Sequence, residues 1–313
     1  MIVLLGATGY IGQAFETALK QRGEQFLSLS RQQLDYTQFD LFLDFLRKNK
    51  PSFIINAAGY TGKPNVDACE NFKADTLQGN TLFPQTVAQA CSALDVPWGH
   101  VSSGCIYSGA KISDFSMTRV ERDLTRVDLK ALRKNNALFG FTEEDEPNFS
   151  FRQPPCSFYS GTKALGEEAI LNVGRSYIWR LRIPFDHLDN ARNYLSKVQR
   201  YAKVYDNVNS LSHRADFVNA CLDTWKVKAP FGIYNVTNPG YVTTRQVVQM
   251  IQDVLKPARG FEFWESDEEF YKVAAKTPRS NCIMDTNKLI SAGVKLRSVE
   301  EALAESLQHW KAE

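Results

Sequence analysis

Two patterns of hydrophobic and polar residues alternate along the first hundred positions. Short, mostly apolar runs of three to six residues are separated by longer segments in which apolar residues recur every three or four positions. The runs are residues 2–5, 25–29, 53–55 and 97–102, and the periodic segments are 11–22, 38–49 and about 76–95. The runs predict buried strands and the periodic segments predict amphipathic helices. This alternation indicates an α/β fold, a doubly wound parallel sheet covered on both faces.

Residues 110–138 interrupt the alternation with a mixture of basic and acidic residues. Apolar residues at helical spacing there predict an inserted surface helix; they are Val120, Leu124, Val127 and Ala131. We favour a solvated excursion over a binding element. The pattern then resumes with a helix over 157–173 and a strand over 176–182. It loosens afterwards, with helices predicted near 192–203, 213–225, 243–255 and 298–311 and short strands such as 233–236.

Composition narrows the class of protein. The 313 residues carry 37 Lys and Arg against 35 Asp and Glu, which argues against a nucleic-acid partner and a membrane surface. No apolar run approaches the roughly 18 residues of a membrane span, and Met1 lacks the basic region of a signal peptide. The six cysteines form no Cys-x-x-Cys pair and have no histidine at metal spacing, so we expect free thiols, no metal and a cytoplasmic location.

A glycine turn follows the first predicted strand. Gly6, Gly9 and Gly12 recur every third residue before the first helix. Glycines there allow a tight turn and a close approach to a pyrophosphate, which the helix N-terminus then attracts. The second strand ends at Ser30 and Arg31 instead of an acidic residue, and a guanidinium suits a ribose 2′-phosphate. We therefore expect a Rossmann-like domain over residues 1–182 that binds NADP(H), and a smaller α/β substrate lobe over 183–313 with some segments returning to the sheet.

Tyr159 and Lys163 stand four residues apart, which places both side chains on one face of the predicted helix. A phenol with a pKa of about 10 is a poor acid at neutral pH, and a neighbouring ammonium group favours the phenolate. We expect Lys163 to lower the pKa of Tyr159, so that Tyr159 gives a proton to a carbonyl oxygen as hydride reaches the carbon. Ser103, at a strand end, is placed to hold the same carbonyl.

These motifs resemble the extended short-chain dehydrogenase/reductases over nearly the whole chain. Within that superfamily the chain resembles the group related to dTDP-4-dehydrorhamnose reductase, and in particular the bifunctional nucleotide-rhamnose synthases. The stretches that carry the resemblance are residues 56–67, 103–107, 140–149, 157–159 with Lys163, 182–184, 234–240 and 278–281.

The resemblance implies roles for particular residues. The catalytic set would be Ser103, Tyr159 and Lys163. The cofactor would contact Gly6, Thr8, Gly9, Tyr10, Ile11 and Gly12 in the pyrophosphate loop, Ser30 and Arg31, Ala57, Ala58 and Gly59 at the riboses, and Tyr159, Lys163 and Pro184 near the nicotinamide. The substrate would contact Lys63, Asn65, Ser103, Cys105, Tyr159, Asn193, Arg279 and Asn281.

Cys105, two residues after Ser103, adds a second chemistry. The resemblance assigns a cysteine at this position to epimerisation. A 4-keto group acidifies the hydrogens on C3 and C5, so a thiolate can remove one while a partner acid returns a proton to the opposite face. The resemblance implies Lys197 as that partner, with His187 as a weaker alternative. The competing interpretations are a buried structural cysteine and an exposed helix lysine.

The sequence therefore predicts NADPH-dependent reduction of the C4 ketone of an NDP-4-keto-6-deoxyhexose, coupled to 3,5-epimerisation and giving a product such as NDP-rhamnose. The alternatives are a 4-reductase alone and a non-catalytic NADP(H)-binding regulatory subunit. The nucleotide, the exact sugar and the oligomeric state stay open, with a homodimer among the arrangements considered.

Overall fold

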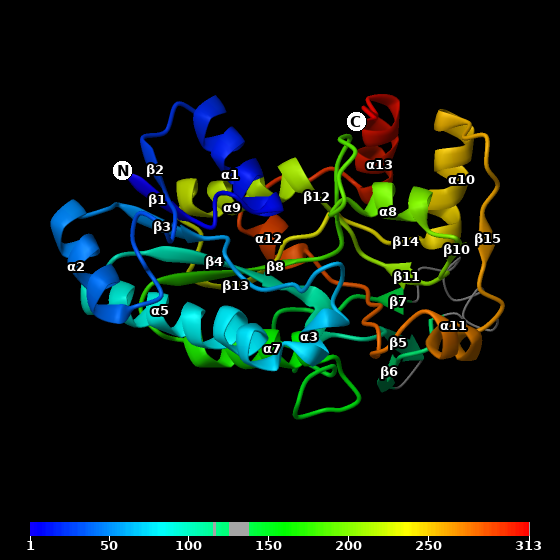
Figure 1. Cartoon of the computed structure of the whole chain (residues 1–313), viewed down its shortest axis with the longest axis horizontal. Helices are drawn as coiled ribbons and strands as arrows, with labels where there is room; N and C mark the ends of the chain where they lie inside the picture. Colours follow the sequence, from blue (N-terminus) through cyan, green and yellow to red (C-terminus); the bar gives the residue numbers. More distant parts are fainter. Residues whose placement is uncertain (115–116, 125–137, 313) are drawn as a thin grey trace.

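A six-stranded parallel sheet forms the centre of the protein (Figure 1). The computed structural model describes residues 1–114, 117–124 and 138–312. In spatial order the strands are β13 (Gly232–Asn235), β8 (Ser176–Leu181), β4 (Trp98–Ser103), β3 (Phe53–Asn56), β1 (Ile2–Leu5) and β2 (Phe26–Leu29). Because β2 and β3 lie on opposite sides of β1, the winding reverses there, and doubly wound folds bind ligands at such a point. The predicted fold class is confirmed.

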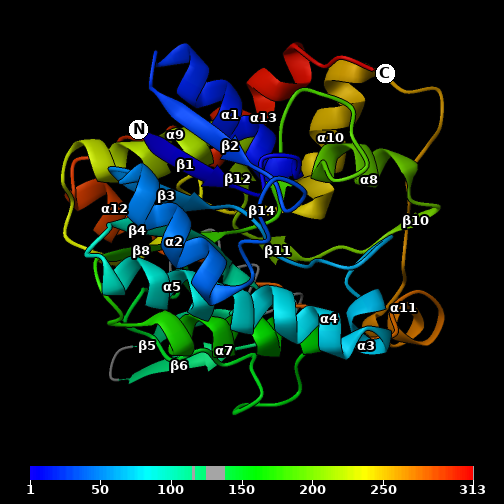
Figure 2. The same cartoon turned by 60° about the vertical axis from the view of Figure 1, so that its left-hand side comes forward.

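Helices cover both faces of the sheet (Figures 1 and 2). One face carries α1 (Tyr10–Gln21), α9 (Arg214–Lys226) and α12 (Asn287–Ser291), and the other carries α2 (Phe39–Asn49), α5 (Phe83–Ala93) and α7 (Phe158–Ile170). Phe15 and Phe217 pack beside Trp179 in the first layer, whereas Phe42 and Val87 lie in the second. The strands are buried on both sides, which explains why they are apolar runs.

The predicted long helix at about 76–95 contains a turn that the sequence pattern did not predict. It consists of α4 (Lys73–Leu77), the π-helical segment η1 (Gln78–Leu82) and α5. Asn80, within η1, accepts from the Tyr60 N–H and donates to the Tyr60 carbonyl, both at 2.9 Å. A π turn thus fastens this helix to the loop after β3, next to the glycine turn.

The inserted segment forms strands where a helix was predicted. Ala110 and Ile112 are buried, whereas Ser113, the residue after Ile112, is exposed. Burial along this segment therefore alternates with a period of two, as in a strand. Of the four residues on which the helix was predicted, Val120 lies in a strand, Leu124 is buried, and Val127 and Ala131 lie outside the described residues. The antiparallel strands are β5 (Ala110–Asp114), β6 (Met117–Glu121) and β7 (Leu138–Phe139).

Most of the chain after β8 packs around a separate apolar cluster that includes Phe185, Leu195 and Leu303. The other helices after β8 are α8 (Tyr194–Arg200), α10 (Thr244–Leu255), α11 (Asp267–Val273) and α13 (Val299–Gln308). The short strands there are β9 (Pro184–Phe185), β10 (Lys203–Val204), β11 (Val208–Asn209), β12 (Ser212–His213), β14 (Val242–Thr243) and β15 (Glu262–Phe263). Within the described ranges, every helix is too short or too polar to cross a membrane.

A buried ion pair fastens α7 to the sheet. Arg180 of β8 donates to Glu167 of α7 from Nε at 3.0 Å and from a terminal nitrogen at 2.7 Å. The Ser102 hydroxyl of β4 also donates to Glu167, and the other terminal nitrogen of Arg180 donates to the Tyr107 hydroxyl at 2.9 Å. Removing one partner of such a pair costs about 3–5 kcal/mol because the other charge stays buried.

Asp216, near the start of α9, joins three segments that are distant in sequence. It accepts from Asn238 and from Arg297, both at 2.8 Å, and lies 3.1 Å from His213. Burial raises the pKa of Asp216, but the hydrogen bonds and charges of these neighbours outweigh burial and lower it from 3.8 to about 2.

We predict that Asp216→Asn lowers the free energy of unfolding by about 2 kcal/mol at pH 7. Because the folded-state pKa is depressed, this stability is fully present above the unfolded-state pKa. It is lost as pH falls from about 3.8 through about 2. Chemical denaturation of both proteins between pH 7 and pH 3 measures the difference. Asp44→Asn, at an exposed position on α2, is the matched control, and a pH-independent difference would contradict the prediction.

Candidate active site

The glycine turn after β1 is tight because backbone atoms occupy the space of two side chains. Gly6 has a φ of 77°, and its carbonyl accepts from the Gly9 N–H at 3.0 Å. A Cβ on Gly12 would lie 2.0 Å from the Gly6 carbonyl oxygen, and a Cβ on Gly6 would lie 2.6 Å from the Ala58 nitrogen. The turn therefore holds the start of α1 against the loop after β3, with the first N–H groups of the helix free for an anion.

Two adjoining hollows of about 420 Å³ and 400 Å³ lie at this turn. Eight residues predicted for the cofactor line them: Gly6, Thr8, Gly9, Ser30, Arg31, Ala57, Ala58 and Gly59. Tyr10 and Ile11 point elsewhere. The Tyr10 ring lies 4.2 Å from the Arg214 guanidinium, and the Ile11 side chain packs against the core.

The end of β2 supplies Arg31, the residue that the sequence analysis predicted to contact a ribose 2′-phosphate. Arg31 is exposed and borders both hollows, while the Ser30 N–H and hydroxyl both donate to Gln33 at 2.9 Å. The buried Ser28 hydroxyl beside them has no partner. Sequence reasoning missed Ser28, and also Tyr36, which borders both hollows, because neither belongs to a spacing motif.

Pro184 begins β9, just after the carboxyl end of β8. The preceding residue, Ile183, has a φ of 37°. A β-branched side chain is strained in this left-handed region, and such strain clusters at ligand sites. The strained Ile183 thus directly precedes Pro184, the residue that the resemblance places near the nicotinamide.

Tyr159 and Ser103 meet at the carboxyl end of β4. Ser157 caps α7 by accepting from the Ser160 N–H at 3.1 Å, which places Tyr159 in the first turn of the helix. Burial raises the pKa of Tyr159, the negative charge of an ionised Cys105 would raise it further, and a hydrogen bond with Ser103 and the charge of Arg182 lower it. The phenol is therefore held protonated, in the form that donates a proton.

Lys163 lies on the cofactor side of the site, as its predicted contact with the cofactor requires. Its ammonium group donates to the Val101 carbonyl at 3.3 Å, and a Cβ on Gly59 would lie 3.4 Å from its nitrogen. Burial lowers the pKa of Lys163. Arg182 is a cation whose charge lowers the pKa of Tyr159. The shared helix face is as predicted, but the ammonium group points toward the cofactor hollow.

Cys105 lies in the single 3-10 turn η2 (Gly104–Ile106) that follows β4. Its N–H donates to the Ser103 hydroxyl oxygen at 3.2 Å, and its side chain is buried. Burial raises the pKa of the thiol, whereas hydrogen bonds with Ser103 and Ser160 and the charges of Arg182 and Lys163 lower it. A buried thiol with two cations in reach differs from an inert core cysteine such as Cys91, whose pKa is raised by burial alone.

Lys197 and His187 lie on separate elements from Cys105. Lys197 is on α8, and burial lowers its pKa, with the charge of Arg192 adding to the effect. His187 lines a hollow of about 470 Å³ together with His213 and His309. In the part of the chain that the structure describes, no hydrogen bond or ion pair joins Lys197 or His187 to Cys105.

Four of the predicted substrate residues lie in two neighbouring segments of the fold. Arg279 makes a bidentate pair with Asp67 at 2.6 and 2.7 Å, and Asn281 accepts from Asn209 at 3.0 Å. Lys63 and Asn65 are exposed in the loop before α3 (Ala68–Asn71), which also contains Asp67. These four residues thus border one region between this loop and the segment around 280.

Asn193 differs from its prediction as a substrate contact. It is fully buried and caps α8 by accepting from the Leu195 N–H at 2.9 Å. Its amide nitrogen donates to Asp186 and to the Leu188 carbonyl. Asn193 is therefore a helix cap whose amide hydrogens are directed to Asp186 and to the Leu188 carbonyl.

Arg182 is a buried residue of the site for which sequence reasoning predicted no role. It follows β8, and one of its terminal nitrogens donates to the Asn209 side chain and to the Ser280 carbonyl. Its charge acts on both Cys105 and Tyr159. The motif at 182–184 marks its position, but only the structure reveals its neighbours.

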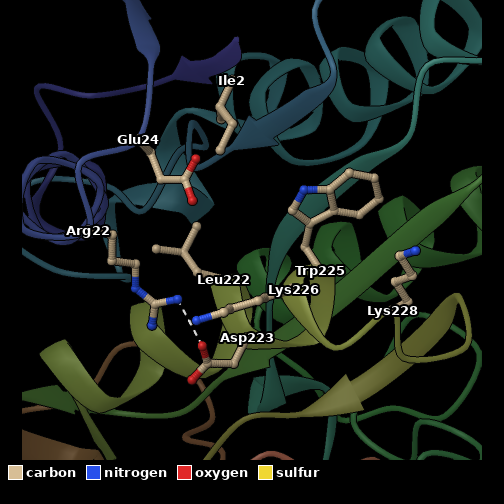
Figure 3. A pocket seen from close by; sticks show the side chains of 8 residues that line it. All are labelled: Ile2, Arg22, Glu24, Leu222, Asp223, Trp225, Lys226 and Lys228. Carbon is tan, nitrogen blue, oxygen red and sulfur yellow. Dashed lines mark hydrogen bonds and ion pairs between the residues drawn. The ribbon is translucent and has the colours of Figure 1, made fainter.

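A further hollow, of about 610 Å³, lies at the opposite edge of the sheet (Figure 3). Ile2, at the start of β1, borders it, whereas the glycine turn follows the other end of that strand. Arg22 there pairs with Asp223 at 2.8 Å and bonds Asn219. No group of three or more metal-ligating side chains occurs among the described residues, either here or at the glycine turn.

The parallel sheet, the glycine turn and the Ser103, Tyr159 and Lys163 set define an extended short-chain dehydrogenase/reductase. The chain belongs to the family of the RmlD substrate binding domain, whose model matches residues 1–312. This confirms the resemblance inferred from the motifs.

Similar proteins support this assignment. A bifunctional dTDP-4-dehydrorhamnose 3,5-epimerase/dTDP-4-dehydrorhamnose reductase of Arabidopsis thaliana is 30% identical over 96% of this chain and 90% of its own length. The fold is similar to the L780 UDP-rhamnose synthase of Acanthamoeba polyphaga mimivirus (TM-score 0.80, 23% identity, 98% of both chains). It is also similar to a dTDP-4-dehydrorhamnose reductase of Bacillus anthracis in complex with NADP (TM-score 0.73, 18% identity, 99% and 96% of the two chains).

We predict that Gly12→Ala weakens dinucleotide binding, because the added methyl group would overlap the Gly6 carbonyl oxygen and displace the turn. Quenching of tryptophan fluorescence by added NADPH measures the effect, with a rise in Kd of at least about tenfold expected. Gly260→Ala is the matched control, since open space surrounds that position. Unchanged binding by the Gly12 variant would contradict the proposed location of the pyrophosphate.

Proposed function

We propose that the protein converts an NDP-4-keto-6-deoxyhexose into an NDP-6-deoxyhexose such as NDP-rhamnose, by 3,5-epimerisation and NADPH-dependent reduction at C4. One observation carries the proposal. A thiol, Cys105, and a protonated phenol, Tyr159, lie in one site, where both are hydrogen-bonded with the Ser103 hydroxyl. A base that removes a proton from C3 or C5 and an acid that protonates the C4 oxygen can therefore act on the same sugar ring.

Each residue of this set has a distinct task. Ser103 holds the C4 oxygen, and Tyr159 donates a proton to it. Cys105 removes a proton from C3 or C5, and Lys197, whose pKa is lowered toward the working range, returns a proton on the opposite face. NADPH, when bound, supplies the hydride for C4. Lys163, which points toward Gly59, holds the ribose of the cofactor.

The residues around the two hollows fit NADP(H) better than NAD(H). The glycine turn provides the close backbone approach that a pyrophosphate needs. Arg31 borders both hollows and stands where an NAD site would carry an acidic residue. The unpartnered Ser28 hydroxyl offers a further hydrogen bond in the same place.

The nucleotide end of the substrate has a basic anchor in Arg279, with Asn281, Lys63 and Asn65 around it. Arg279 is paired with Asp67, so a diphosphate would have to share or replace that carboxylate. UDP, dTDP and GDP all meet this requirement. We place the protein in the cytoplasm because all six cysteines are free, and a homodimer remains part of the proposal.

We predict that Arg31→Ala raises the Kd for NADPH about ten- to a hundredfold, the loss of one or two charge-assisted hydrogen bonds to a phosphate. The Kd for NADH should change by less than about threefold, because NADH has no 2′-phosphate. Equilibrium titration with both cofactors measures the ratio. Arg47→Ala, on the exposed side of α2, is the control. A parallel loss for both cofactors would refute the assignment of Arg31 to the phosphate.

We predict that Cys105→Ser loses epimerisation and keeps reduction. Given UDP- or dTDP-4-keto-6-deoxyglucose and NADPH, the wild-type protein should form the rhamnose product, while the variant should form at least about a hundredfold less. Given the already epimerised 4-keto-rhamnose nucleotide, the variant should reduce it within about threefold of the wild-type rate. Chromatography of the nucleotide sugars measures both reactions.

Two outcomes would contradict the proposal. If wild-type protein consumes NADPH but yields an unepimerised sugar, the protein is a 4-reductase alone and Cys105 is structural. If neither nucleotide sugar is turned over although NADPH binds tightly, the protein fits a regulatory subunit, and a stable complex with a second enzyme should then be found.

A further inference from the structure

Two buried arginines stand two residues apart at the end of β8, and their surroundings differ. Arg180 is paired with Glu167. Arg182, which is 5% exposed, has no carboxylate within ion-pair distance among the residues that the structure describes. One terminal nitrogen donates to Asn209 Oδ1 and to the Ser280 carbonyl, each at 2.5 Å, and its Nε has no partner. A buried guanidinium held only by neutral groups is costly, which indicates that an anion forms beside it during function.

Arg182 packs against the turn that carries Cys105. A Cβ on Gly104, the residue before Cys105, would lie 3.6 Å from Arg182 Cδ. Asn209, which holds the guanidinium, also accepts from the Cys282 N–H at 3.0 Å, and the Cys282 thiol donates to the Gly104 carbonyl at 3.4 Å. The arginine and the turn are thus joined by direct packing and by a short chain of hydrogen bonds.

We propose that Arg182 is the counter-ion of the Cys105 thiolate and keeps this thiolate available as the base of epimerisation. The inference rests on the proposed function. The thiolate takes a proton from C3 or C5 and becomes a thiol, and the electron pair of the C–H bond moves into the C4 carbonyl as an enolate. A second acid then gives a proton to the opposite face, and the thiol returns its proton to solvent. The step has no redox change.

Several groups besides Arg182 face Cys105. They are the hydroxyls of Ser103 and Ser160, the ammonium group of Lys163, the phenol of Tyr159 and the thiols of Cys69, Cys156 and Cys282. Only Arg182 and Lys163 among these are cations. Both charges act on the thiol, but the Lys163 ammonium group is bonded to the Val101 carbonyl and points toward the cofactor hollow, whereas Arg182 packs against the turn that carries Cys105.

The test compares Arg182→Met and Arg182→Lys with wild-type protein. The pKa of Cys105 is measured from the ultraviolet absorbance of the thiolate, as the difference between each protein and the same protein with Cys105→Ser. Arg182→Met should raise this pKa by about one or more, a tenfold loss of thiolate at fixed pH, and Arg182→Lys should recover most of it. Arg175→Met, before the other end of β8, is the matched control and should leave the pKa unchanged.

A second variant covers the case in which Arg182→Met does not fold. Asn209→Asp keeps the arginine and places a carboxylate on the nitrogen that now contacts an amide oxygen. The guanidinium is then neutralised in place, and the pKa of Cys105 should rise as in Arg182→Met. An unchanged pKa in both folded variants overturns the proposal.

Substrate exchange separates this role from a structural one. In D₂O at pH 7, Arg182→Met should slow deuterium uptake at C3 and C5 at least about tenfold, and raising the pH should restore it. Reduction of the already epimerised 4-keto sugar does not use the Cys105 thiolate, so raising the pH should not restore any fall in its rate. A parallel, pH-independent fall of both reactions overturns the proposal. If wild-type protein exchanges no deuterium, the epimerase function itself fails, and the thiol titration still decides the role of Arg182.

Discussion

The buried ion pair between Glu167 and Arg180 holds together the three elements that form the site. Glu167 lies one helical turn after Lys163 and two turns after Tyr159, and it receives hydrogen bonds from β8 and from Ser102 of β4. Ser103 follows Ser102 directly. The pair therefore determines how the helix that carries the acid sits on the strand that leads to Ser103 and Cys105. Because both charges are buried, a change in either partner would disturb the whole arrangement.

At the same sheet edge, burial and nearby cations together set the pKa values of the reactive groups. Burial raises the pKa of both the Tyr159 phenol and the Cys105 thiol, and the charges of Arg182 and Lys163 oppose this effect at the thiol. Lys163 is directed to the cofactor side, and Arg182 has no carboxylate within ion-pair distance among the described residues. This division explains how one small site can supply an acid for the ketone and a base for the neighbouring carbons.

Local patterns predicted the sheet, its helices and the glycine turn, because each depends on periodicity or spacing along the chain. The insertion did not follow its helical spacing, since Ile112 packs with Ile283, a partner far away in sequence. A spacing of four placed Tyr159 and Lys163 on one helix face, yet the Val101 carbonyl decides where the ammonium group points. Likewise, a motif marks the position of Arg182, but the absence of a counter-ion there is a property of the fold.

The central claim is that one site exchanges protons at C3 and C5 and reduces C4. It is tested most directly by NMR of UDP-4-keto-6-deoxyglucose with the wild-type protein in D₂O, before and after addition of NADPH. The account predicts deuterium at C3 and C5 without NADPH, and a rhamnose product carrying that deuterium once NADPH is added. A reduced sugar with no deuterium at either carbon would contradict it.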